Sequence, residues 1–139
     1  MRKTKPPYIV IDDDLLNNMI CKITLEMALG AVQVETFSNA EVALDFIRLN
    51  YDDADNDDGV TLILLDINMP IMSGWEFLDS FDAFSEDIKK QFRIYLLSSS
   101  VDDRDKEKAK QNKNVIDYLS KPLSKDMVKQ IDVPVNRTR

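Results

Sequence analysis

The sequence contains no histidine and only one cysteine, Cys21. Without histidine, the chain has no Ser-His-Asp or Cys-His catalytic group and no histidine-bound metal. A single cysteine excludes an internal disulfide and a cysteine-rich zinc site, so we interpret Cys21 as a small residue in or near the core. Any metal bound by this chain must therefore have oxygen ligands, which favours a hard cation such as Mg²⁺.

Long hydrophobic runs and clustered positive charge are missing as well. No apolar stretch has the length needed to cross a bilayer, and no apolar signal region follows the first residues. The net charge is −7, whereas a surface that binds a nucleic acid duplex needs clustered Lys and Arg. We therefore expect a cytoplasmic protein with no membrane partner and no direct nucleic-acid partner.

The chain has 139 residues, of which 44% are hydrophobic. This length supports one domain with a proper core. We expect the domain to span residues 8–132, between an N-terminal tail over residues 1–7 and a C-terminal tail over residues 133–139. Neither an internal repeat nor a second domain is visible in the sequence.

The most informative stretch is LILLDINMPIMSG, from Leu62 to Gly74. A continuous apolar run such as Leu62–Leu65 is typical of a strand buried on both faces. The run ends in Asp66, and Asn68, Pro70 and Gly74 then break it. An acid at the C-terminal end of a central strand occupies the edge where open α/β sheets bind ligands.

Strands and helices are predicted to alternate along the chain. The predicted strands are Tyr8–Ile11, Val32–Phe37, Leu62–Leu65, Phe92–Leu97 and Val115–Leu119. The predicted helices are Leu15–Leu29, one running to about Asn50, one that begins near Ser73, Val101–Asn112 and Ser124–Ile131. This alternation predicts a parallel sheet with helices on both faces, and Ser85–Gln91 is expected to be a polar connection.

Three of these helices carry more specific expectations. The first is predicted to be amphipathic, with one apolar face made of Leu16, Met19, Ile20, Ile23 and Met27. The second and third begin with capping boxes, at Ser38 to Glu41 and at Ser73 to Glu76. Their inward residues are expected to be Val42, Ala43, Phe46 and Ile47 in the second helix, and Phe77, Leu78 and Phe81 in the third.

The acidic loop DDADNDD suggests a calcium site as an alternative, because Asp53, Asp55 and Asp57 have the first spacings of an EF-hand loop. The glycine, however, is one position late at Gly59, and the twelfth position is Leu64 instead of Glu. We therefore interpret this segment as a solvated acidic loop.

Five chemically active residues follow predicted strands: Asp12 and Asp13 after the first, Asp66 after the third, Ser98 after the fourth and Lys121 after the fifth. In a parallel sheet these ends face one way. Three neighbouring carboxylates repel one another unless a cation joins them, and Mg²⁺ would satisfy them. A nucleophile, a metal, a lysine and a hydroxyl donor are the groups that phosphoryl transfer requires. Each residue alone also has a purely structural interpretation, and Asp14 in particular is expected to cap the following helix.

The segments IDDD, LLDINMPIMSG, LLSSS and YLSKP resemble the receiver domain of two-component response regulators, and the resemblance covers about Tyr8 to Ile131. It implies a flavodoxin-like (βα)5 fold, a doubly wound α/β sheet of five parallel strands in the order 2-1-3-4-5. It also implies that Asp66 accepts a phosphoryl group, and that Asp12, Asp13, Asp66 and the backbone carbonyl of Asn68 hold Mg²⁺.

The same resemblance implies roles near the end of the sheet. Lys121 is similar to the lysine that pairs with the phosphoryl group, and Pro122 to a proline that usually follows in a cis peptide. Ser98 and Tyr118 are similar to the switch residues of the family. The implied output surface is the face made by Val101–Asn112, Val115–Leu119 and Ser124–Ile131.

The implied partners are a sensor histidine kinase or a histidine phosphotransfer protein, and a downstream protein target, with a phosphorylation-dependent homodimer as a further expectation. The chain reads as a receiver alone, and it is expected to catalyse only its own phosphorylation and dephosphorylation. Two alternatives remain at this point. One is a Mg²⁺-dependent phosphohydrolase similar to the haloacid dehalogenases, in which Asp12 and Asp14 would form a D-x-D motif. The other is a pseudoreceiver that works without phosphorylation.

Overall fold

The computed structural model describes residues 5–52 and 59–132. Five parallel strands form one sheet in the order β2-β1-β3-β4-β5, as expected for the flavodoxin-like fold. The strands are β1 (Tyr8–Ile11), β2 (Val34–Phe37), β3 (Thr61–Leu65), β4 (Phe92–Ser98) and β5 (Val115–Ser120). Each lies within two residues of its predicted position, since short apolar runs bounded by polar residues define strands clearly.

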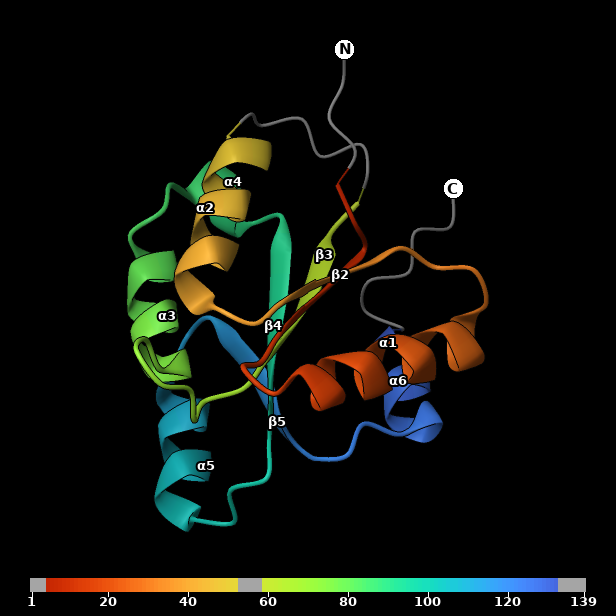
Figure 1. The fold of residues 1–139 in the computed structure, drawn as a ribbon. Helices are drawn as coiled ribbons and strands as arrows, with labels where there is room; N and C mark the ends of the chain where they lie inside the picture. Colours follow the sequence, from red (N-terminus) through yellow and green to blue (C-terminus); the bar gives the residue numbers. More distant parts are fainter. Residues whose placement is uncertain (1–4, 53–58, 133–139) are drawn as a thin grey trace.

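Helices cover both faces of this sheet (Figure 1). They are α1 (Leu15–Leu29), α2 (Ala40–Asn50), α3 (Gly74–Asp82), α4 (Glu86–Lys89), α5 (Asp103–Gln111) and α6 (Lys125–Asp132). Helices α1 and α6 pack on one face, and α2 to α5 lie on the other. The short helix α4 was not predicted: it lies within the expected polar connection and buries only Ile88.

The sheet divides the core into two layers because successive side chains of a strand point to opposite faces. Ile63 and Leu65 of β3 belong to the layer under α2 and α3, whereas Leu62 and Leu64 belong to the layer under α1 and α6. All residues of β3 are buried, as predicted for a central strand of a parallel sheet.

Helix α1 is rotated relative to the expectation from its hydrophobic pattern. Its buried residues are Asn17, Asn18, Cys21 and Leu25, so the interpretation of Cys21 as a core residue is confirmed. The predicted apolar face, made of Leu16, Met19, Ile20, Ile23 and Met27, is exposed. Hydrogen bonding explains this orientation of α1. The Asn17 and Asn18 amides donate hydrogen bonds to Asp12, and turning these amides to solvent would leave buried acceptors unpaired.

Two helix caps lie where the sequence predicts them, and a third lies one residue later than predicted. Asp14 caps α1 by accepting from the backbone of Leu16 and Asn17, and the Ser73 capping box at α3 is present as predicted. At α2, however, the cap is Asn39 instead of Ser38. Val42 of this helix is exposed, against the prediction, while Ala43 and Ile47 are buried.

Three further sequence-based expectations concern the acidic loop, the peptide bond before Pro122 and the length of the helices. The acidic positions Asp53, Asp55 and Asp57 lie outside the described residues, as do residues 1–4 and 133–139. The Lys121–Pro122 peptide bond is cis, as the resemblance implied. Among the helices of residues 5–52 and 59–132, none combines the length and the apolar character needed to span a membrane.

Candidate functional site

Three carboxylates meet at the C-terminal edge of the sheet. Ile11 and Leu65 are register partners in β1 and β3, and Asp66 N donates to Ile11 O at 3.0 Å. The acids that follow these two strands are therefore neighbours. One oxygen from each of Asp12, Asp13 and Asp66 lies within 4.8 Å of the other two. Asp12 and Asp66 are buried and Asp13 is exposed, so the cluster opens to solvent on one side.

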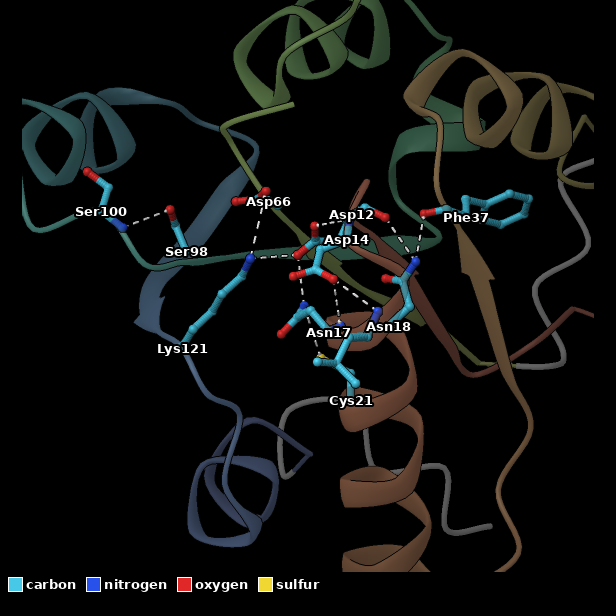
Figure 2. A network of polar contacts seen from close by, with 11 residues as sticks. Asp12, Asp14, Asn17, Asn18, Cys21, Phe37, Asp66, Ser98, Ser100 and Lys121 are labelled. Carbon is cyan, nitrogen blue, oxygen red and sulfur yellow. Dashed lines mark hydrogen bonds and ion pairs between the residues drawn. The ribbon is translucent and has the colours of Figure 1, made fainter. Parts of the chain in front are cut away.

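The carboxylate of Asp12 is fixed by hydrogen bonds on both oxygens (Figure 2). Oδ1 accepts from the backbone N–H of Asp14 at 2.9 Å. Oδ2 accepts from Asn17 Nδ2 at 2.8 Å and lies 2.7 Å from Lys121 Nζ. A buried carboxylate is costly unless such partners compensate it, and here they leave Asp12 in one orientation facing Asp66.

Lys121 places a positive charge between two of the acids. Its Nζ lies 2.7 Å from Asp12 Oδ2 and 3.8 Å from Asp66 Oδ2. Burial alone would lower the pKa of Lys121, but the hydrogen bond to Asp12 and the attraction of Asp66 outweigh it and raise the pKa. The lysine is therefore charged whenever the site is at neutral pH.

The surroundings of Asp66 strongly perturb the protonation of its carboxyl group. Burial and the nearby charge of Asp12 raise its pKa to about 6, while Lys121 and a backbone hydrogen bond from Asn68 act in the opposite direction. A second cation beside Asp66 would favour its ionised form. The donor set is all oxygen, which fits a hard divalent cation and no softer metal.

Ser98 and Tyr118 are joined through Ser100 in the loop after β4. The buried Ser98 Oγ accepts from the backbone N–H of Ser100 at 3.1 Å, and Tyr118 Oη donates to Ser100 O at 2.9 Å. Ser100 Oγ also donates to Asp105 of α5 at 2.7 Å. Ser98 is thus bonded to its own loop, and within the described residues no hydrogen bond joins it to Asp66 (Figure 2).

Two further residues shape the site, and the sequence analysis missed their roles. Asn17 holds Asp12 from the first turn of α1. Gly74 begins α3 directly against the phosphoacceptor candidate: a Cβ at this position would lie 2.5 Å from Asp66 O. Gly74 was recognised only as a break in the hydrophobic run. Neither contact has a sequence pattern, since both depend on how a helix packs against a strand end.

Replacing Asn17 by Ala is expected to weaken Mg²⁺ binding by about tenfold, because groups that orient a metal-ligating side chain typically contribute 10–100-fold in affinity. A fluorescence titration can measure the change, since Trp75 is the only tryptophan and lies in the first turn of α3, directly after Gly74. Asn50→Ala is the matched control, because within residues 5–52 and 59–132 the Asn50 amide donates to Phe46 O alone, inside α2. Equal affinities in both variants would contradict a role for Asn17 in orienting Asp12.

Replacing Gly74 by Ala is expected to destabilise the fold by about 1–3 kcal/mol, since the added methyl group displaces the backbone at Asp66. Phosphorylation by a small phosphodonor should slow at the same time. Gly30→Ala is the comparison: Gly30 has a φ of 86° but no atom within 4 Å of the added Cβ. That variant should lose stability in a urea titration yet keep the wild-type rate of phosphorylation; a rate loss in both would show that stability alone is responsible.

Comparison with known proteins gives a consistent result. The sequence model described as the response regulator receiver domain matches residues 8–131. A two-component response regulator from Cytophaga hutchinsonii is 29% identical to this chain, with a TM-score of 0.82. The match covers 92% of this chain and 94% of the Cytophaga chain. A response regulator receiver protein from Dyadobacter fermentans is 30% identical with a TM-score of 0.77, covering 88% and 94%.

A more distant structural relative has the same fold. The chemotaxis protein CheY4 of Vibrio cholerae is 21% identical to this chain, with a TM-score of 0.71 over 96% of this chain and 100% of its own. At this identity the likeness concerns the fold alone. Among curated proteins, none matches this chain.

Proposed function

This chain belongs to the family of response regulator receiver domains, and on that basis we propose that Asp66 accepts a phosphoryl group from a phosphohistidine. Receivers are signalling domains of two-component systems and not conventional enzymes. Because the receiver family model matches residues 8–131, this function is favoured over the alternative of a haloacid-dehalogenase-like phosphohydrolase. The observation that carries the proposal is the meeting of Asp12, Asp13, Asp66 and Lys121 at one edge of the sheet.

In the proposed reaction, one carboxylate oxygen of Asp66 attacks the phosphorus atom. A P–O bond to Asp66 forms, the P–N bond to the donor imidazole breaks, and the imidazole leaves with that electron pair and takes up a proton. Lys121 supplies a fixed positive charge for the phosphoryl oxygens, and Ser98 supplies a hydroxyl donor once it turns from its own loop. Positioning and charge are the main requirements of phosphoryl transfer.

Mg²⁺ is the proposed cofactor. Asp12, Asp13, Asp66 and the backbone carbonyl of Asn68 would hold it, and it would neutralise the charge of the transferred group. The closely spaced carboxylate oxygens support this assignment. The raised pKa of Asp66 supports it as well, because burial and the neighbouring Asp12 disfavour the ionised carboxylate and a bound cation would favour it.

The proposed output is a change in the loop between β4 and α5. A phosphoryl group on Asp66 would attract the Ser98 hydroxyl by a charge-assisted hydrogen bond. That movement breaks the Ser98–Ser100 bond, and Ser100 in turn holds Tyr118 and Asp105. Helix α5 buries only Ala109, so a small free-energy change can move it. The face formed by α5, β5 and α6 would then bind a downstream protein or a second copy.

A receiver of this kind would work in the cytoplasm with a sensor histidine kinase or a histidine phosphotransfer protein as donor. The test is the intact mass of the protein after incubation with phosphoramidate and Mg²⁺. Gain of one phosphoryl group on Asp66 is expected, and removal of Mg²⁺ by a chelator should prevent it. A protein that gains no mass would instead be a pseudoreceiver.

A further inference from the structure

Helix α5 makes few buried contacts with the rest of the domain. Ala109 is the only one of its nine residues that is buried. At the start of the helix, Asp105 accepts a hydrogen bond from Ser100 Oγ in the preceding loop, and Arg104 pairs with Asp102, the cap of the helix itself. These polar contacts hold the first turn, so the position of the last turn depends on other side chains.

The last turn of α5 reaches α3 through one charged side chain. Lys108 Nζ lies over the ring of Trp75 in α3, 4.7 Å from the ring centroid. An ammonium group within about 6 Å of an aromatic centroid is attracted by the face of the ring, and tryptophan binds cations best in this way. Helices α3 and α5 lie on the same face of the sheet (Figure 1). Among the residues that the structure describes, this contact is the one polar interaction of an α5 side chain with another helix.

Trp75 is the fixed member of this pair. It follows Gly74, whose backbone N–H donates to Ile67 O at 3.0 Å and whose Cα leaves no room for a Cβ beside Asp66 O. The half-buried ring of Trp75 also packs against the core layer that contains Ala109. A displacement of Trp75 would therefore disturb the backbone at Asp66, whereas α5 can shift and carry Lys108 with it.

The Lys108–Trp75 contact is made in the unphosphorylated domain. In the proposed output change, Ser98 turns toward a phosphoryl group on Asp66 and the loop before α5 rearranges. Helix α5 can then leave its position only if the Lys108 ammonium leaves the ring. A contact present in one of two states favours that state by its own free energy. For an exposed cation–π contact this corresponds to about two- to fivefold in the equilibrium constant.

We propose that the Lys108–Trp75 contact holds α5 in its unphosphorylated position and that phosphorylation of Asp66 breaks this contact. Lys108 is a positioning residue, since it acts through the conformation of α5 and does not touch the reacting atoms. The inference rests on the proposed function, because it names the contact that opposes the output change. Coupling between two sites is reciprocal, so breaking the contact from the α5 side also favours the phosphorylated state.

The first measurement is the affinity of the full chain for beryllium fluoride, a phosphoryl mimic, by calorimetry with Mg²⁺. Lys108→Met keeps an unbranched apolar side chain but removes the charge, so the mimic should bind about two- to fivefold more tightly. Lys108→Arg keeps a cation that stacks on tryptophan and should retain the wild-type affinity. Lys110→Met is the matched control, because Lys110 is an exposed lysine in the same last turn of α5. It should leave the affinity unchanged.

The second measurement is the fluorescence of Trp75, which reports on the contact directly because it is the only tryptophan. When beryllium fluoride is added to the Mg²⁺-bound wild type, the emission of Trp75 should change as the ammonium group leaves the ring. This change should be largely absent in Lys108→Met and normal in Lys110→Met. A double-mutant cycle isolates the pair: in a Trp75→Leu background, Lys108→Met should no longer alter the affinity for beryllium fluoride.

Equal affinities of the wild type and Lys108→Met would overturn the proposal. An equal gain in Lys110→Met would overturn it as well, because the loss of any positive charge from α5 would then be responsible. Wild-type protein that binds beryllium fluoride without a change in Trp75 emission would show that the contact persists, which also contradicts the proposal. Failure of the wild type both to bind beryllium fluoride and to accept phosphate from phosphoramidate would instead count against the proposed function of Asp66.

Discussion

Replacing Asp66 by Asn is expected to abolish phosphorylation and to raise the free energy of unfolding by about 1–3 kcal/mol at pH 8 without metal. The amide keeps the shape of the carboxyl group but offers no anionic oxygen to attack phosphorus. The stability gain has a separate cause. Burial and the neighbouring Asp12 raise the pKa of Asp66 from 3.8 to about 6, so the folded state resists its ionisation.

The pH dependence has a definite sign. A carboxyl group whose folded-state pKa is raised favours folding while it is protonated, and this contribution is lost as the pH rises from about 4 through about 6. The Asn variant lacks this titration. Its advantage over the wild type should therefore be largest above pH 6 and should disappear near pH 4.

Urea titrations at pH 8 and pH 4, together with intact mass after phosphoramidate treatment, can measure both effects. Asp79→Asn is the control, because Asp79 is an exposed carboxylate on α3. It should be phosphorylated like the wild type and show no comparable gain in stability. A mass gain that persists in Asp66→Asn would contradict the assignment of Asp66 as the phosphoacceptor. Equal free energies of unfolding for the wild type and Asp66→Asn at pH 8 would contradict the electrostatic explanation.

Replacing Lys121 by Ala is expected to lower the free energy of unfolding by about 2–4 kcal/mol at pH 8 without metal, because removal of one partner leaves buried carboxylates uncompensated. The ammonium group of Lys121 lies 2.7 Å from Asp12 Oδ2 and 3.8 Å from Asp66 Oδ2, so its removal takes the positive charge away from both carboxylates. Mg²⁺ should recover part of this loss, since the three carboxylates remain. The loss should also shrink as the pH falls below 6 and Asp66 becomes protonated.

The same variant tests how the site communicates with the rest of the domain. After treatment with a phosphoryl mimic, wild-type protein should show altered amide exchange in β4 and β5, whereas Lys121→Ala should bind metal but show little of this change. Lys125→Ala, on the exposed start of α6, is the control and should behave as the wild type. A normal exchange response in Lys121→Ala would rule out the lysine as the coupling residue.

Much of the fold could be predicted from the sequence because parallel sheets depend on local patterns. The run Leu62–Leu65 is apolar throughout and short, which is typical of a strand buried on both faces. The alternation of strands and helices then predicts that all strand ends face one way. For this reason the sequence alone could predict that Asp12, Asp66 and Lys121 lie near one another.

Helix α1 shows what a hydrophobic pattern does not determine. Periodicity identified an apolar face, but the structure turns that face to solvent and buries Asn17 and Asn18. The orientation depends on Asp12, whose buried oxygens require donors that only these two amides provide from α1. A requirement of this kind comes from a residue on another element, so no window of the α1 sequence contains it.

The sequence by itself determined the five strands, the helix cap at Asp14, the capping box at Ser73 and the acids at the strand ends, because each depends on neighbours along the chain. Only the tertiary structure decided the rotation of α1 and the contact of Gly74 with Asp66. Those features depend on hydrogen bonds and close packing between segments distant in sequence, and such contacts exist only once the sheet and its helices are assembled.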